Sequence, residues 1–132
     1  MWLFTTRGFY SVTLAYEGGP DDLQIRGRTL EALHALQARH PVLADLEVVV
    51  TPTADYWYRI VTTRAVVAQV VADEAKAIDY GNFKAEAYNA TLRRPGSTHF
   101  MDALHSVWAA LRRTQLLEAP APGTVRPAKV AK

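Results

Sequence analysis

Alternating apolar and polar residues predict two β-hairpins in the first half of the chain. Residues 8–16 and 23–28 both alternate, and the glycine- and proline-containing residues 17–21 form the turn between them. The apolar residues 46–51 and the alternating residues 58–63 predict the second hairpin. In this interpretation the first five residues extend the first strand, and Gly8 forms a bulge in it.

A period of three to four residues between apolar positions predicts the helices. It covers residues 29–39, residues 65–78 and a last helix capped by Ser97, and a weaker pattern covers residues 82–90. Thr29 is a typical residue to cap the first helix. We therefore expect an α+β fold made of two ββα units. They form a four-stranded, mostly antiparallel sheet with helices on one face, followed by the C-terminal helix.

Length and charge refine this picture. A chain of 132 residues fits one domain, and 49% hydrophobic residues suffice for a core. We expect a single domain over residues 1–117 and a disordered, basic, Pro/Ala-rich tail over residues 118–132. Three basic residues and one acid give the tail a charge of +2, equal to the net charge of the whole chain. The predicted domain is therefore near neutral, which does not favour a broad nucleic-acid surface.

Several classes of site are excluded or disfavoured. The absence of cysteine excludes disulfides, thiolate nucleophiles and cysteine-bound metals. Two of the four histidines, His99 and His105, are close, but their spacing does not place two ligands on one helix face, so no metal site is expected. No cofactor motif is present. Neither a secretory signal nor an apolar run of membrane-spanning length occurs, so we expect a soluble cytoplasmic protein with no membrane partner.

Two segments, residues 54–59 and residues 78–84, concentrate acids, bases and aromatic rings. We expect them to line one polar pocket, with Gly81 adopting a positive φ so that the second segment can turn inward. Arg26 and Arg28 are expected nearby. The candidate residues of the two segments are Asp55, Tyr56, Arg59, Asp79, Asn82 and Lys84.

Ordinary structural roles explain some of the same residues. Asp55 can cap a turn, Tyr58 can belong to the core, and Arg59 can pair with an acid. Gly81 can end one helix while Asn82 begins the next.

Arg26 and Arg28 carry a further alternative. They alternate with Leu23 and Ile25, so they project from the sheet face opposite the core. Arginines beside aromatic residues on an open sheet bind single-stranded nucleic acid in several folds, with Tyr10 or Trp57 as neighbours here. The aromatic RNA-binding signature is absent, so a partly solvated face or a dimer surface is the simpler interpretation.

The chain also resembles a family of small bacterial proteins without an assigned activity. The resemblance covers most of residues 1–110, and the segment beginning at Ile78 is its most specific part. It implies a genuine domain and no mechanism. Its segments are Trp2-Leu3-Phe4-Thr5, Gly8-Phe9-Tyr10-Ser11-Val12, Ile25-Arg26-x-Arg28, Asp55-Tyr56-x-Tyr58-Arg59, Ile78-Asp79-Tyr80-x-Asn82-Phe83-Lys84 and His105-x-Val107-Trp108.

The sequence thus predicts a non-catalytic binding module, self-associating, with a pocket for a small anionic ligand or an acidic peptide. One alternative is a small enzyme in which Asp55 or Asp79 is the acid or base and Arg59 or Lys84 stabilises negative charge. The other is a single-stranded nucleic-acid binder that uses the sheet face of the two arginines Arg26 and Arg28.

Overall fold

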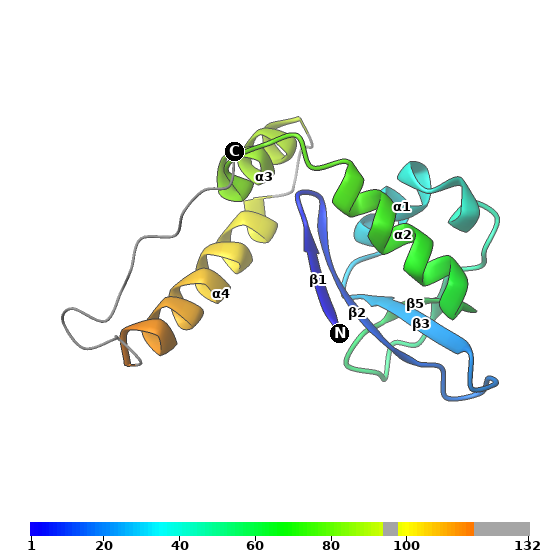
Figure 1. Cartoon of the computed structure of the whole chain (residues 1–132). Coiled ribbons are helices and arrows are strands. Elements are labelled where there is room, and N and C mark those ends of the chain that lie inside the picture. The colour runs from blue at the N-terminus through cyan, green and yellow to red at the C-terminus, as the bar shows by residue number, and fades with distance from the viewer. Residues whose placement is uncertain (94–97, 118–132) are drawn as a thin grey trace, which may run out of the picture. The chain divides into compact units, whose positions relative to one another are not determined.

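The computed structural model describes residues 1–93 and 98–117, which form an α+β fold (Figure 1). These residues fall into two compact units, one on each side of residue 95, and each is described by itself. The elements are β1 (Trp2–Thr5), β2 (Gly8–Leu14), β3 (Asp22–Gly27), α1 (Leu30–Arg39), a 3-10 helix η1 (Pro41–Leu43), β4 (Val49–Val50), β5 (Tyr58–Thr63), α2 (Arg64–Lys76), α3 (Phe83–Leu92) and α4 (Thr98–Leu117).

The described strands form one antiparallel sheet in the order β1-β2-β3-β5-β4. Both predicted hairpins are confirmed, but the sheet has five strands and not four. Residues 2–5 fold back on β2, because the Thr5 hydroxyl accepts hydrogen bonds from the backbone N–H groups of Arg7 and Gly8 at 3.2 and 3.1 Å. This closes a tight turn, so Gly8 begins a strand and is not a bulge. As a result α1 follows three strands, and the chain does not consist of two ββα units.

The predicted strand over residues 46–51 shortens to the two residues of β4. Leu46 and Val48 pack against the core instead of pairing in the sheet. The Gln37 side-chain amide donates to the carbonyls of Leu43 and Leu46 at 3.0 and 2.8 Å. These bonds hold the segment as a loop beside α1.

Helices α1 and α2 share one hydrophobic core with the sheet. Leu23 and Ile25 are buried in it, as expected from their alternation with the arginines. The Tyr10 hydroxyl donates to the Ala32 carbonyl at 2.9 Å, which ties β2 to α1. The remaining buried residues of this core are Val12, Ala32, Leu33, Leu36, Leu43, Ile60, Val67 and Val70.

Side-chain caps set the starts of three helices. Thr29, Thr63 and Asn82 each accept a hydrogen bond from a backbone N–H of the first turn. The Asn82 cap confirms its predicted structural role. Helix α2 ends at Lys76 with Ala77 as its C-cap, and Gly81 has no left-handed φ. Both interpretations of Gly81, the positive-φ turn and the end of the preceding helix, are therefore wrong.

The second unit contains α4, and the last helix is thus confirmed. Met101 and Leu104 are buried, whereas Trp108 and Leu111, which continue the same stripe, are exposed. The predicted Ser97 cap and the tail over residues 118–132 lie outside the described residues, and the expectation of a single domain over residues 1–117 stays a prediction. Among the helices described, none is both long enough and apolar enough to span a membrane.

Candidate functional site

Three arginines gather on the sheet face that points away from Leu23 and Ile25. In the sheet register Arg26 of β3 lies directly opposite Arg59 of β5, and Arg28 follows just beyond β3. Asp55 and Tyr56 reach them from the segment before β5. We call Arg26, Arg28, Asp55, Tyr56 and Arg59 the arginine cluster. All five were candidates from the sequence, and the structure brings them together.

Asp55 neutralises Arg28. The Arg28 Nη1 donates to the Asp55 carboxylate at 2.9 Å and to the Asp55 backbone carbonyl at 3.1 Å. Both side chains are largely exposed. The hydrogen bond that Arg28 donates to the Asp55 carboxylate raises the pKa of Arg28 above its ordinary value. Arg28 stays charged throughout the working pH range, and the exposed pair contributes little to stability.

Tyr56 anchors the cluster. Its side chain is only 5% exposed. The guanidinium carbons of Arg28 and Arg26 lie 4.4 and 4.7 Å from the centre of its ring, within the range of cation–π attraction. The Tyr56 backbone carbonyl accepts a hydrogen bond from Arg59 Nη2 at 3.2 Å. One residue therefore orders all three arginines.

Among the described residues, Arg26 and Arg59 have no balancing acid. Arg26 Nη2 donates to the Ser11 hydroxyl at 2.7 Å, but no ion pair of the described residues includes either arginine. The Nε atoms of both are buried and have no hydrogen-bond partner in the described part of the chain. Two like charges face each other across neighbouring strands, an arrangement that is unfavourable for folding.

Aromatic side chains extend this face toward β1. Trp2 meets Phe9 edge to face at 5.4 Å, and Phe4 lies 4.6 Å from Phe9 between ring centres. Phe9 lies 6.3 Å from Tyr56. We call Trp2, Phe4, Phe9 and Tyr56 the aromatic row. Tyr10, expected as an arginine neighbour, is buried in the core on the opposite face, because side chains alternate along β2.

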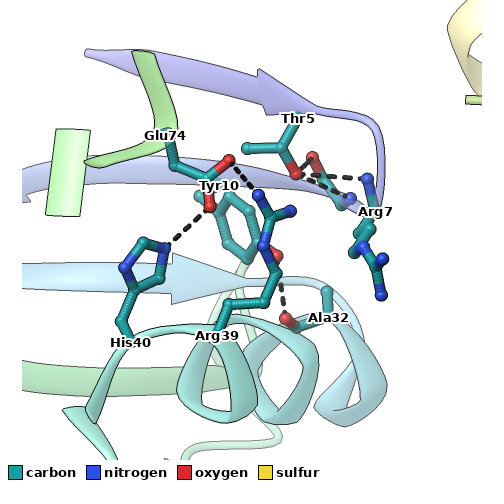
Figure 2. Close-up of polar contacts among 8 residues, drawn as sticks. Thr5, Arg7, Tyr10, Ala32, Arg39, His40 and Glu74 are labelled. Atoms are coloured by element: carbon teal, nitrogen blue, oxygen red, sulfur yellow. Dashed lines mark hydrogen bonds and ion pairs between the residues drawn. The ribbon is translucent and has the colours of Figure 1, made fainter. Parts of the chain in front are cut away.

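Asp79 does not belong to the arginine cluster but lines a separate cavity of about 210 Å³. The β1–β2 turn, Arg39, Glu74 and residues after α2 line it. Figure 2 shows Glu74 between Arg39 and His40, which it contacts at 3.0 and 2.7 Å. Glu74 and His40 are nearly buried, so this contact joins the end of α1 firmly to α2.

The predicted residues of the second segment do not form one site. Asp79 lines the cavity but is itself exposed. Asn82 uses its side chain to cap α3, and Lys84 is exposed on the first turn of that helix. None of the residues that line this cavity belongs to the arginine cluster. The structure therefore separates Asp79 from the arginines that were expected to share its pocket.

Sequence reasoning missed two sets of residues. Ser11, Phe9 and Trp2 were not chosen, although the alternation of β2 places Phe9 and Ser11 on the arginine face once the register is known. The Glu74–His40 contact joins residues that are 34 positions apart, so no local sequence pattern predicts it.

Comparisons with protein-family models, with curated proteins and with solved structures found no match. Within residues 1–93 and 98–117, no three His, Asp or Glu side chains are grouped so that they could hold a metal ion. The arginine cluster and its surroundings are therefore the features that point to a function.

Proposed function

We propose that this chain is a non-catalytic binding module that holds an anionic group between Arg26 and Arg59. The observation that carries the proposal is the pair of facing guanidiniums, between which no carboxylate of residues 1–93 and 98–117 lies. Their Nε atoms are closed to solvent and have no partner among the described residues, which adds to the cost of the pair. A bound anion would not reach these atoms, but it would balance the charge of the pair through the N–H groups that the two partly exposed side chains present.

The chemistry of the two side chains fits an oxyanion. Each guanidinium offers N–H donors in a planar fork that matches carboxylate or phosphate oxygens. Side chains directly opposite on antiparallel strands start about 5 Å apart, so one anion can contact both arginines. Its negative charge would turn a repulsive pair into an attractive triad.

The cluster is also held in place before binding. Ser11 fixes the end of Arg26, the Tyr56 carbonyl fixes Arg59, and the Tyr56 ring lies beneath Arg26. Side chains that are already ordered lose less entropy on binding, so affinity does not require a deep pocket.

The enzyme alternative has less support. The cavity beside Asp79 is smaller than the roughly 300 Å³ at which ligand pockets usually begin. Asp79 is exposed, and Asp55 is committed to Arg28. A general acid or base works best when it is shielded from water and free to exchange its proton with a substrate, and both aspartates are exposed. Binding therefore explains the residues better than catalysis.

Thermal unfolding with added inorganic phosphate or citrate tests the proposal. A ligand whose free concentration is ten times its Kd stabilises the folded state by about 1.4 kcal/mol. This raises the Tm of a domain of this size by roughly 6–10 °C. Both anions also stabilise proteins without specific binding, so the variants decide the outcome.

Arg59→Ala is expected to lose the specific shift. Arg64→Ala is the matched control, because Arg64 is a surface arginine paired with Asp21 at the start of α2. If wild type, Arg59→Ala and Arg64→Ala respond alike to both anions, the proposed site does not exist.

A further inference from the structure

The arginine cluster continues into an aromatic surface on the same face of the sheet. The aromatic row begins at Tyr56, beneath the guanidiniums, and runs through Phe9 to Trp2. Trp2 is 67% exposed although it is a large apolar side chain at the edge of a sheet. Along one line across the sheet, Trp2 pairs with Ser11, Ser11 with Arg26, and Arg26 with Arg59.

The candidate ligands differ in how much of this face they use. A bare anion or an acidic peptide would engage the arginines and leave Trp2 without a role. A second copy of the chain, docked by the same face, would place Arg26 and Arg59 of both copies in one interface without a balancing acid from the cluster. This charge disfavours the face for the expected self-association, which stays a prediction.

We propose that the ligand is a nucleotide unit, whose phosphate lies between Arg26 and Arg59 and whose base stacks on the exposed ring of Trp2. The proposal rests on the anion site proposed above and names its ligand. Bases stack on aromatic side chains irrespective of sequence. Trp2 is two strands from Arg26, about 10 Å between backbones at a strand spacing of about 4.8 Å. The side chains of Trp2 and Arg26 project from the same face.

The charge of the first unit limits how many phosphates of a nucleic acid it can contact. Residues 1–93 contain nine Lys and Arg against eleven Asp and Glu, so the unit has no excess positive charge. Arg28 is already paired with Asp55, which leaves Arg26 and Arg59 as the cluster's two phosphate contacts. A single strand held by two contacts loses only about 7-fold in affinity between 50 and 200 mM salt, far less than a broad basic surface would.

A free nucleotide and a single strand present the same chemistry, and the experiment separates them. The full-length chain is titrated with inorganic phosphate, with AMP, with mixed-sequence DNA and RNA decanucleotides and with an acidic peptide. Binding of labelled decanucleotides is followed by fluorescence anisotropy, and binding of the small anions by calorimetry. All variants keep the basic tail, so any binding by the tail is common to them.

Two variants and one control separate binding of the base from binding of the phosphate. Trp2→Leu keeps an apolar side chain without a flat ring, and it is expected to weaken nucleotide binding about 5- to 100-fold while phosphate binding is unchanged. Arg59→Ala is expected to weaken both. Arg64→Ala is expected to weaken neither. Unchanged circular dichroism of each variant establishes that it is folded.

Each outcome has one meaning. Equal binding of AMP and decanucleotide identifies a free nucleotide, and tighter binding of the decanucleotide identifies a strand. If phosphate binds through Arg59 but bases add nothing and Trp2→Leu has no effect, the nucleotide inference is overturned and the anion site stands. Tightest binding of the acidic peptide overturns it as well. If no anion binds, both proposals fail.

Discussion

The arginine pair leads to a prediction that a purely structural role would not make: Arg59→Glu should stabilise the fold. In wild type, Arg59 faces Arg26 across the strands, and its Nε is buried and has no partner within the described part of the chain. A glutamate at this position would face Arg26 with the opposite charge. The same variant should lose anion binding, because it places a carboxylate where the ligand's own charge would lie.

The magnitude follows from the contacts. Removing the unpaired Nε gains about 1 kcal/mol, the low end of the penalty for a buried unsatisfied group. Replacing a like-charge pair by an opposite-charge pair gains about 0.5 kcal/mol for the lost repulsion and about 0.5 kcal/mol for the new attraction. Losing the hydrogen bond from Arg59 to the Tyr56 carbonyl costs about 1 kcal/mol. The net gain is about 1 kcal/mol, or roughly 4–8 °C in Tm.

Urea and thermal unfolding of wild type, Arg59→Glu and Arg59→Gln measure this gain. The neutral Arg59→Gln loses the repulsion but gains no attraction, so it should be stabilised by only about 0.5 kcal/mol. In 1 M salt, where charges are screened beyond about 3 Å, the difference between the two variants should shrink. If Arg59→Glu is less stable than wild type, the arginine pair is not strained, and the two guanidiniums do not require an anion between them.

Three further predictions concern the fold around the site. Glu74→Ala leaves buried His40 without its partner and should destabilise the protein by about 3 kcal/mol in urea unfolding, and a loss below about 1 kcal/mol would contradict the view of this contact as a firm link. Gly8→Ala puts a Cβ 2.6 Å from the hydroxyl of Tyr10, a buried side chain that cannot move away, and should lower stability by about 2 kcal/mol; an unchanged Tm would disprove this. Asp55→Ala breaks only an exposed pair and should change the free energy of unfolding by less than about 1 kcal/mol, so a larger loss would mean that Asp55 is a structural anchor.

The sequence predicted the fold where local patterns and final structure agree. The alternation of β2 and β3, the cap at Thr29 and the helical period of α4 are local properties, and each was located within a few residues. The first strand was missed because its turn uses the Thr5 hydroxyl and carries no Asn-Gly or Pro-Gly signal. Residues 46–48 were misassigned because Gln37, on another element, holds them outside the sheet.

The candidate site, too, could be predicted only where local patterns determine it. Arg26 and Arg28 could be assigned to one face from alternation alone, and Asp55 and Tyr56 were chosen for their chemistry. That Arg26 meets Arg59 depends on the pairing of β3 with β5, which is set by the whole sheet. The expected pocket with Asp79 depended on how two distant turns would meet, a relation that no periodicity encodes.

The strand order determines when the sheet can be completed as the chain is synthesised. β3 pairs with β2, which precedes it, and with β5, which ends at Thr63 after a helix and a loop. During synthesis from the N-terminus, β3 therefore presents an open edge until more than thirty further residues have emerged. Closing that long loop brings the two facing arginines together, so we expect it to be the slow step of folding, and the interval before it to be when nascent chains are most prone to aggregate.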